Sequence, residues 1–250
     1  MDSGFYAALT GLVAKSDALD LTANNFANIS TTGYKAQHEF YHALEAAPSG
    51  PISPLTQAVD NYGVLGGADI DLKAGSLKPT GNDLDVALGG SGFLVVKTSA
   101  GYRYTRNGNL QLSPKGELLS SQGDPVMGVI PGKKEPGPIT VPPGKITISP
   151  SGAISSGGTM AGQLKLVDFP HGTPLSMEGS SYLTAPAQSE VPAKEPDLHQ
   201  GALESSNVNP MQGMVSLVML QRQFDMMQKV VTTIDKDFNS TAISQLPNVQ

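Results

Sequence analysis

The string His38-Glu39-Phe40-Tyr41-His42 matches the pattern H-E-x-x-H. On a helix this spacing places both imidazoles on one face, where they hold zinc while the glutamate acts as a general base for peptide hydrolysis. A catalytic zinc site also needs a third protein ligand, and Glu45, His171 and His199 have no recognisable relation to the pair. The surrounding stretch is predicted to be a connector rather than a helix. We therefore favour two solvated histidines and keep a zinc peptidase as an alternative, which stoichiometric bound zinc would reveal.

Other residues make a weaker case for catalysis. Asp83 and Asp85 share one face of a predicted strand, where two solvent-facing charges are a commoner arrangement than an acid–base pair. Gly89-Gly90-Ser91-Gly92 lacks the lysine of a phosphate-binding loop, and we interpret it as a turn. The sequence therefore predicts a protein that is not an enzyme, with no catalytic residue, no bound metal, no cofactor and no small-molecule substrate.

The composition limits the kinds of partner. The 250 residues carry a formal net charge of −6, which argues against nucleic acid or an anionic lipid surface as the main partner. The chain contains no cysteine, so disulfides and thiolate metal sites are excluded. The most apolar run, Met214 to Leu220, is far shorter than the ~20 residues that span a bilayer, so membrane insertion is not expected. The first residues predict no cleaved secretory signal, because they lack a basic region followed by an apolar one.

Both ends of the chain show the spacing of a packed helix. Apolar or small residues recur alternately four and three positions apart, which keeps one narrow seam facing a partner helix. The N-terminal seam comprises Phe5, Leu9, Leu12, Ser16, Leu19, Ala23 and Phe26, and the C-terminal seam comprises Leu217, Leu220, Phe224, Met227, Val231, Ile234 and Phe238. Neither seam can be buried by its own helix. Either the two ends pair as one hairpin within a monomer, or they pair and also contact other copies in a filament.

The C-terminal stretch is also rich in methionine. Five of the nine methionines lie in it, namely Met211, Met214, Met219, Met226 and Met227. Methionine is flexible and polarizable, so it suits surfaces that pack against neighbours in different settings. The cluster leaves two interpretations open, ordinary core filling and an interface with several partners.

Between its ends the chain is predicted to be β structure. We divide it into an N-terminal helical segment over 1–35, an extended connector over 36–80 with a short hairpin around Gly63 to Lys73, a β domain over 81–195, and a C-terminal segment with a helix over 196–250. Asn107-Gly108 predicts a tight hairpin, because a type I′ turn needs positive φ. Strands are predicted at 83–88, 93–96, 102–105, 110–112, 139–141, 146–148 and 163–167, with turns at 114–116, 123–125 and 150–152.

The limits of the two helices are also predicted. The first should run to about Ser30, with Gly33 able to adopt the left-handed conformation that stops a helix. The second should begin near Asn209, because Pro210 suits a first turn. The predicted fold class is therefore α+β. In this fold the N- and C-terminal helices pair as a coiled coil and form an all-α core domain. The all-β domain is central in the sequence, and an extended region connects it to the N-terminal helix.

Three stretches resemble the bacterial flagellar rod and hook proteins. They are Ala23–Lys35, which we term the N-terminal signature, Leu203–Pro210, the C-terminal signature, and Tyr104–Gly108, the central motif. Further matches at 84–88 and 92–96 extend the resemblance over nearly the whole chain, and 137–142 and 162–167 are most like proximal rod members, with distal rod members second. The residues that carry the two signatures are Asn25, Asn28, Thr31, Gly33, Tyr34, Lys35, Ser206, Asn207 and Val208.

The resemblance implies a structural role. It implies helical polymerisation through the terminal helices, in the rod of the flagellar basal body, which transmits torque from motor to hook across the periplasm. The partners implied are other copies of the chain, other rod proteins and the flagellar type III export apparatus. The resemblance also implies export without a cleaved signal, no binding of nucleic acid and no membrane insertion. Two alternatives of other classes stay open, the zinc peptidase suggested by His38 to His42 and a secreted β-domain binding module, which should work without the terminal helices.

Overall fold

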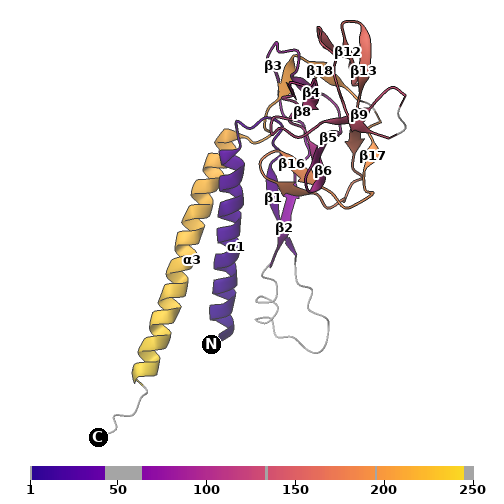
Figure 1. Ribbon diagram of the computed structural model, residues 1–250. Helices are drawn as coiled ribbons and strands as arrows, with labels where there is room; N and C mark the ends of the chain where they lie inside the picture. Colours follow the sequence, from indigo (N-terminus) through magenta and orange to yellow (C-terminus); the bar gives the residue numbers. More distant parts are fainter. Residues whose placement is uncertain (1, 43–63, 133–134, 195, 245–250) are drawn as a thin grey trace. The chain divides into compact units, whose positions relative to one another are not determined.

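The computed structural model describes residues 2–42, 64–132, 135–194 and 196–244 (Figure 1). The chain divides into two compact units. Unit 1 consists of Met1–Phe26, Gln37–Asp69 and Pro210–Gln250, and unit 2 consists of Ala27–Ala36 and Ile70–Asn209. Unit 1 holds two long helices and a hairpin, whereas unit 2 is built from strands. The predicted α+β class is confirmed, with a mostly β core and one helix toward each end of the sequence.

The helices of unit 1 are α1 (Asp2–Ala27) and α3 (Pro210–Ser244). Pro210 occupies the first turn of α3, as predicted, because the N–H that proline lacks has no partner within a helix at that position. α1 ends at Ala27 rather than near Ser30, since the next residues form a turn in which the Thr31 hydroxyl donates to Asn28 Oδ1 at 3.0 Å. No helix in the described part of the chain is long and apolar enough to cross a bilayer.

A hairpin of β1 (Gln37–His42) and β2 (Val64–Ile70) also belongs to unit 1. The hairpin predicted around Gly63 to Lys73 is wrong, because β2 pairs with β1 and not with the residues that follow it. The string His38 to His42 lies in β1, where a rise of about 3.3 Å per residue separates the two histidine backbones by about 13 Å. In a strand the two histidines therefore lack the spacing by which an H-E-x-x-H helix holds zinc. Glu45 and the connector residues 43–63 lie outside the described residues.

Unit 2 contains two larger sheets and several two-stranded ones, and their pairings are antiparallel. The six-stranded sheet has the order β15 (Ser176–Glu178), β16 (Tyr182–Thr184), β6 (Gly101–Thr105), β5 (Phe93–Thr98), β14 (Leu166–Asp168) and β17 (Val191–Pro192). The five-stranded sheet has the order β10 (Gly137–Pro138), β9 (Met127–Val129), β13 (Thr159–Leu164), β12 (Ala153–Ser156) and β11 (Ile146–Ile148). The two-stranded pairs are β18 (Leu198–Gln200) with β4 (Val86–Leu88), β19 (Ala202–Glu204) with β3 (Leu77–Pro79), and β7 (Gln111–Leu112) with β8 (Leu118–Leu119).

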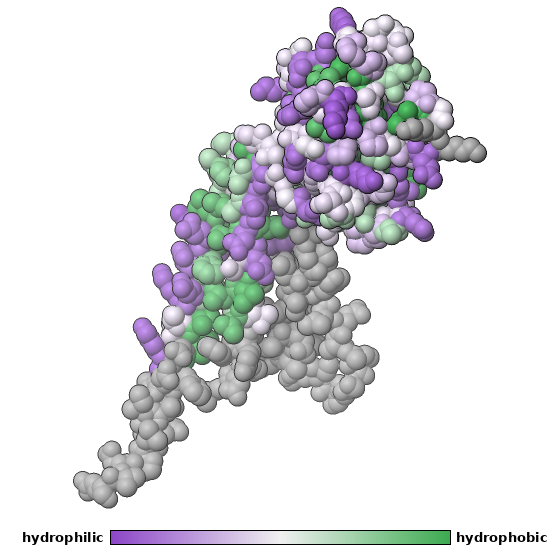
Figure 2. All heavy atoms as spheres, in the orientation of Figure 1, coloured by the Kyte–Doolittle hydropathy of each residue, from purple (hydrophilic) through white to green (hydrophobic). Residues whose placement is uncertain are grey.

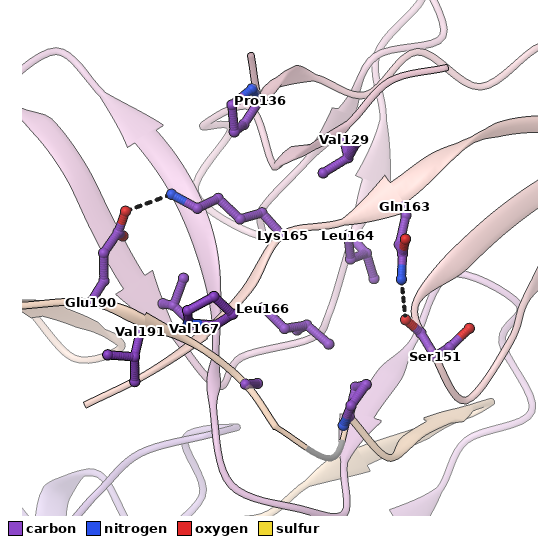
Figure 3. A pocket seen from close by; sticks show the side chains of 13 residues that line it. Val129, Pro136, Ser151, Gln163, Leu164, Lys165, Leu166, Val167, Glu190 and Val191 are labelled. Carbon is purple, nitrogen blue, oxygen red and sulfur yellow. Dashed lines mark hydrogen bonds and ion pairs between the residues drawn. The ribbon is translucent and has the colours of Figure 1, made fainter. Parts of the chain in front are cut away.

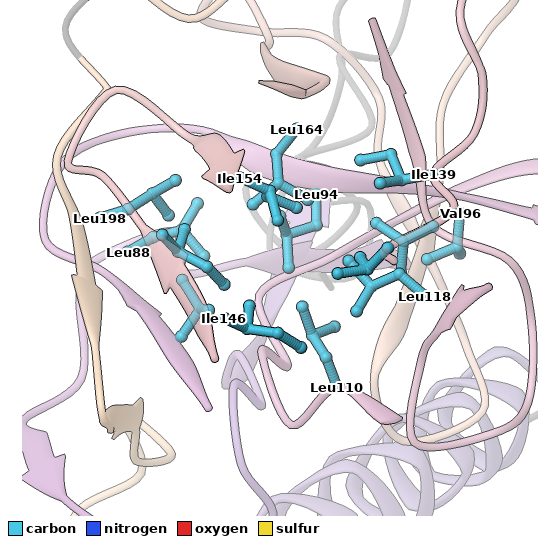
Figure 4. Close-up of a cluster of buried hydrophobic side chains, with 14 of the residues drawn as sticks. Leu88, Leu94, Val96, Leu110, Leu118, Ile139, Ile146, Ile154, Leu164 and Leu198 are labelled. Atoms are coloured by element: carbon cyan, nitrogen blue, oxygen red, sulfur yellow. The ribbon is translucent and has the colours of Figure 1, made fainter. Parts of the chain in front are cut away.

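The strand β5 contributes to two hydrophobic clusters. Leu94 and Val96 belong to the larger cluster, and Phe93 and Val95 belong to the smaller one. Side chains alternate between the faces of a strand, so a strand covered on both faces needs a continuous apolar run. The central strand predicted at 93–96 is therefore confirmed. The larger cluster, shown in Figure 4, includes Leu88, Leu94, Val96, Leu110, Leu118, Ile139, Ile146, Ile154, Leu164 and Leu198.

The dipeptide Asn107-Gly108 does not close a hairpin, contrary to the prediction. β6 pairs with β5 and β16, and β7 pairs with β8. Instead, Val86 N donates to Gly108 O at 3.0 Å, and a Cβ on Gly108 would lie 1.7 Å from Val86 O. Glycine is required here by the close approach of two backbones and not by positive φ. The predicted turns are confirmed at Gly116, Gly123 and Gly152, whose φ angles are 81°, 90° and 85°.

Three strand predictions need correction. The strand predicted at 83–88 begins only at Val86, as β4, and Asp83 lies in the turn before it. The strand predicted at 163–167 is divided between β13 and β14, which belong to different sheets, with Lys165 between them. The strand predicted at 139–141 is reduced to one bridge between Thr140 and Glu117, just after β10. Local alternation of residue types does not indicate where a strand ends or where a chain passes from one sheet to another, so these differences are not visible in the sequence.

Asp85 is not the solvent-facing charge that the sequence predicts. It is 4% exposed, and its carboxylate accepts hydrogen bonds from the side chains of Thr80, Asn82 and Asn109 at 2.6, 3.2 and 3.0 Å. Asp83 is exposed, as expected. The two carboxylates therefore have different environments, and Asp85 fixes the loop that leads into β4.

Candidate functional site

The N-terminal signature begins inside α1, and its residues after Ala27 form a turn within unit 2. Thr31 N donates to Asn28 O at 3.1 Å, and Tyr34 N donates to Thr31 O at 3.3 Å. Gly33 has a φ of 67°, and a Cβ there would lie 2.4 Å from the carbonyl carbon of Arg106. Both the positive φ and the close approach favour glycine at this position.

The C-terminal signature is bonded to this stretch through Asn207. Its Oδ1 accepts from Ala36 N at 2.7 Å, while its Nδ2 donates to Asp71 O at 2.8 Å and to Lys73 O at 3.2 Å. Asn207 N also donates to Tyr34 O at 3.4 Å. An asparagine side chain offers both a donor and an acceptor, so one residue joins segments on either side of it.

Glu204 joins both signatures to the central motif. Its side chain is fully buried, and its Oε1 accepts from Lys35 Nζ at 2.7 Å and from Gly75 N at 2.8 Å. Arg106 Nη1 donates to Oε2 at 3.0 Å and to Oε1 at 3.3 Å. The carbonyl of Glu204 accepts from Gly33 N at 2.8 Å. We term Lys35, Arg106 and Glu204 the junction, since each comes from a different one of the three stretches.

The junction buries two cations and one carboxylate. Charges that leave water are stable only when they are paired and hydrogen-bonded. Backbone carbonyls meet the excess positive charge, since Lys35 Nζ donates to Lys73 O at 2.6 Å, and Arg106 donates to Gly90 O at 2.6 Å and to Gly92 O at 3.0 Å. Burial lowers the pKa of Lys35, and the hydrogen bond of its ammonium group to the carboxylate opposes that shift.

The glycine-rich stretch 89–92 therefore has a structural explanation. It presents carbonyl oxygens to a guanidinium, whereas a phosphate site presents N–H groups. The Arg106 guanidinium carbon also lies 5.4 Å from the centre of the Phe93 ring, in a cation–π contact. Within the described ranges, no group of three His, Cys, Asp or Glu residues could hold a metal ion. The junction is thus suited to holding chain segments together rather than to chemistry.

The remaining signature residues lie around the junction or before it. Asn25 is in α1, where its Nδ2 donates to Gln37 O at 2.7 Å and its Oδ1 accepts from Gln37 N at 2.9 Å, which fixes the start of β1. Ser206 Oγ accepts from Val208 N at 3.3 Å in the turn before α3. Tyr34 is 2% exposed, and burial raises the pKa of its hydroxyl.

The predicted seam residues of α3 are its less exposed ones. Leu217, Leu220, Phe224, Met227, Val231 and Ile234 are half-buried, whereas most other described side chains of α3 are exposed. In α1, Leu12, Ser16, Leu19 and Phe26 are half-buried, but Leu9 is 39% exposed and Ala23 is also exposed. The most buried described residue of α1 is Ala18, which lies outside the predicted seam. The stripe on α1 is therefore displaced toward its small residues. The side chains of Phe5 and Phe238 lie outside the described residues.

Two contacts place α1 beside α3 in antiparallel orientation within unit 1 (Figure 1). A Cβ on Gly11 would lie 2.9 Å from Met227 Cε, and a Cβ on Gly213 would lie 3.5 Å from Phe26 Cδ2. Late residues of α1 thus face early residues of α3. Of the five methionines in this stretch, Met227 lies in this contact, and the other four are exposed.

A pocket of about 370 Å³ lies in unit 2, among residues of β9, β13, β14 and β17 (Figure 3). Its charged groups pair with each other, since Lys165 Nζ donates to Glu190 Oε1 at 2.6 Å and the Tyr104 hydroxyl donates to Glu190 Oε2 at 3.0 Å. Most of its other lining residues are apolar, such as Val129 and Val191. The pocket therefore presents no catalytic set.

Sequence reasoning missed Arg106 and Glu204 as site residues. Both lie inside stretches that match the family, but an ion pair between residues 98 positions apart has no local signal. The signal that could have identified these two residues is their charge. Charged residues make up only 15% of the chain, and these two lie within the stretches that carry the resemblance, as Lys35 does.

Two long helices lie side by side, and in the β unit the segments next to them meet at one carboxylate, an arrangement typical of a structural assembly subunit. Three family models match the chain: "Flagella basal body rod protein" over residues 5–35, "Flagellar hook protein FlgE/F/G D1 domain" over 87–156, and "Flagellar basal body rod FlgEFG protein C-terminal" over 199–244. Each range contains one member of the junction.

Curated relatives agree with these matches. The chain is 38% identical to the basal-body rod protein FlgF of Salmonella typhimurium over 95% of this chain and 96% of the relative. It is 36% identical to FlgF of Escherichia coli, with 94% and 95% covered, and 30% identical to FlgG of Buchnera aphidicola, with 91% and 94% covered. The chain belongs to the family of flagellar basal-body rod proteins, which are structural rod subunits. The predicted resemblance is confirmed.

Proposed function

We propose that this rod protein polymerises through its paired terminal helices to form part of the flagellar drive shaft. The observation that carries the proposal is a second apolar stripe on α3. Val215, Met219, Met226 and Val230, which we term the outer stripe, are 58%, 56%, 59% and 47% exposed. At about 100° per residue, this stripe is centred about 120° around the helix from the half-buried seam. Figure 2 shows hydrophobic side chains exposed over the helical part of the molecule.

The outer stripe needs a covering surface. Large exposed apolar patches are rare on monomeric soluble proteins and mark interaction sites. The outer stripe is two pairs of exposed apolar side chains, with the exposed Arg222 and Gln223 between them. The seam faces the other helix of the same chain, so the outer stripe remains exposed after the helices have paired. Its methionines can adapt to different neighbours. The outer stripe thus supports the interpretation of the methionine cluster as an interface with several partners.

Contact between the outer stripe and a different surface of the next subunit gives a helical rod. Such a contact is heterologous, and a heterologous contact that does not close into a ring generates a filament. The neighbours we propose are other copies of this chain and other rod proteins, after export by the flagellar type III apparatus into the periplasm. Identity of 38% to one FlgF and 30% to one FlgG favours the proximal rod over the distal rod.

One substitution in the outer stripe tests this function. Met219→Asp should abolish incorporation of the chain into purified hook–basal bodies, because a charge would face an apolar neighbour without a partner. Gln221→Asp is the matched control, since Gln221 is also exposed on α3 but lies outside the stripe and the seam. It should be incorporated normally. Incorporation of Met219→Asp at the level of Gln221→Asp would refute the proposal, and the level of the rod at which the chain is found distinguishes proximal from distal.

A further inference from the structure

One carboxylate holds the two segments that lead to the helices. Lys35 lies eight residues after the end of α1 at Ala27, and Glu204 lies six residues before the start of α3 at Pro210. Arg106 attaches the same carboxylate to the segment that follows β6. Both segments are therefore fixed at one point by directional bonds rather than by apolar packing alone.

Backbone contacts prevent these segments from sliding past their neighbours. Gly33 N donates to Glu204 O at 2.8 Å, and Ser205 N donates to Ser76 O at 2.9 Å. A Cβ on Gly75 would lie 1.9 Å from Ser205 O, so the chains approach as closely as backbones can. A shift of either segment would break several of these bonds together, in a region where Glu204 and its cations have almost no contact with water.

We infer that Glu204 is a positioning residue that sets the register of α1 against α3. The inference rests on the proposed assembly through the helices, where register matters. A slip by one heptad would move one helix by about 10 Å along the other. It would also keep the apolar seams in contact, because their pattern repeats every seven residues. The seams alone do not exclude the slipped pairing, whereas a fixed starting point for both helices does.

Cysteine pairs report the register directly, since the chain has no cysteine of its own. Phe26→Cys with Gly213→Cys is the native pair, and Phe26→Cys with Leu220→Cys is the pair for a slip of one heptad. In the otherwise unchanged full chain, mild oxidation should form only the native disulfide. In Glu204→Gln, the native disulfide should fall at least threefold and the slipped disulfide should appear.

Asp85→Asn is the matched control for loss of a buried carboxylate in unit 2. Asp85 is 4% exposed and accepts from three side chains, but none of them belongs to either signature. Asp85→Asn should lower the melting temperature of unit 2 and keep the native disulfide. Loss of the native disulfide in this variant, to the extent seen in Glu204→Gln, would overturn the inference.

A double variant separates positioning from stability. Glu204→Gln leaves two buried cations without an anion, whereas Lys35→Met with Glu204→Gln returns the net charge of the junction to its original value. The melting temperature of unit 2 should then recover in part, because Arg106 keeps the carbonyls of Gly90 and Gly92 as acceptors. The native disulfide should stay low because the bond between the signatures is still absent. Recovery of both would overturn the inference, as would an unchanged disulfide in Glu204→Gln. Normal cross-linking in a chain that fails to enter the rod would instead refute the proposed function.

Discussion

Replacing Gly33 by alanine tests how closely the N-terminal signature must approach the central motif. Two separate costs are expected. The φ of 67° costs an alanine about 1–2 kcal/mol. The new methyl group would also lie 2.4 Å from Arg106 C and 2.5 Å from Asn107 N, which are backbone atoms that cannot rotate away. Overpacking of this kind costs about 1–3 kcal/mol. The free energy of unfolding of unit 2 should therefore fall by about 2–5 kcal/mol.

Gly81→Ala is the matched control for this substitution. Gly81 has a φ of 74°, but nothing lies within 4 Å of the position that its Cβ would occupy. It should lose only the conformational part, about 1–2 kcal/mol. With a shift of about 2–4 °C per kcal/mol, calorimetry of the full chain should show melting of unit 2 lowered by about 10 °C in Gly33→Ala and by about 4 °C in Gly81→Ala. Equal shifts would refute the argument from close approach, and no shift in either would also refute the cost of the left-handed backbone.

Three further predictions concern the helices, a loop and a tyrosine. Leu217→Asp or Phe224→Asp should place an unpaired charge in the seam. Far-UV circular dichroism should then show less helix, and the chain should fail to enter the rod, while the melting temperature of unit 2 stays unchanged. Retained helix signal and normal incorporation would contradict this. Gln188 has a φ of 63°, a conformation that glycine adopts without strain. Gln188→Gly should therefore raise the free energy of unfolding by about 0.5–1 kcal/mol after the entropic cost of glycine is subtracted. A lower denaturation midpoint in this variant would contradict the prediction. Burial raises the pKa of Tyr104 to about 12, whereas the pKa of an unfolded tyrosine is about 10. Between these pH values the folded chain keeps a proton that the unfolded chain releases. The free energy of unfolding should therefore fall as the pH rises from about 10 to about 12. Tyr104→Phe should weaken that pH dependence, and an equally steep loss of stability in the variant would contradict the assignment.

The parts of the fold that the sequence predicts are those fixed by local periodicity. α3 begins at Pro210 as expected, because a helix start depends on a few neighbouring residues. The strand β5 is central because Phe93–Val96 is apolar on both faces. The turns at Gly116 and Gly152 follow from the residue types within each turn. In each case the residue types that predict the structure lie within about one turn of helix, one strand or one tight turn.

The parts that escaped prediction depend on residues distant in the sequence. Gly108 resembles a hairpin glycine, yet it is required by the approach of Val86 from another strand. Asp85 resembles a solvated charge until Asn109 is brought beside it. The junction is the clearest case, since Lys35 and Glu204 are 169 positions apart and neither has a periodic pattern around it. A single sequence identified the stretches that matter, but it could not show that they meet.

The ionic character of the junction follows from what a rod subunit must control. Hydrophobic contact is non-directional, so an apolar joint would hold the same segments over a range of alignments. A carboxylate that accepts from Lys35, Gly75 and Arg106 is satisfied only when all three donors converge on it. Buried ion pairs add little net stability over well-packed apolar groups, and some are retained because they specify one arrangement. The helices carry a repeating seam that several alignments satisfy, so a fixed point outside the repeat helps to select one alignment, together with the close contacts at Gly11 and Gly213. The junction lies in the two segments that lead to those helices, so a shift of either segment would change the alignment of α1 with α3.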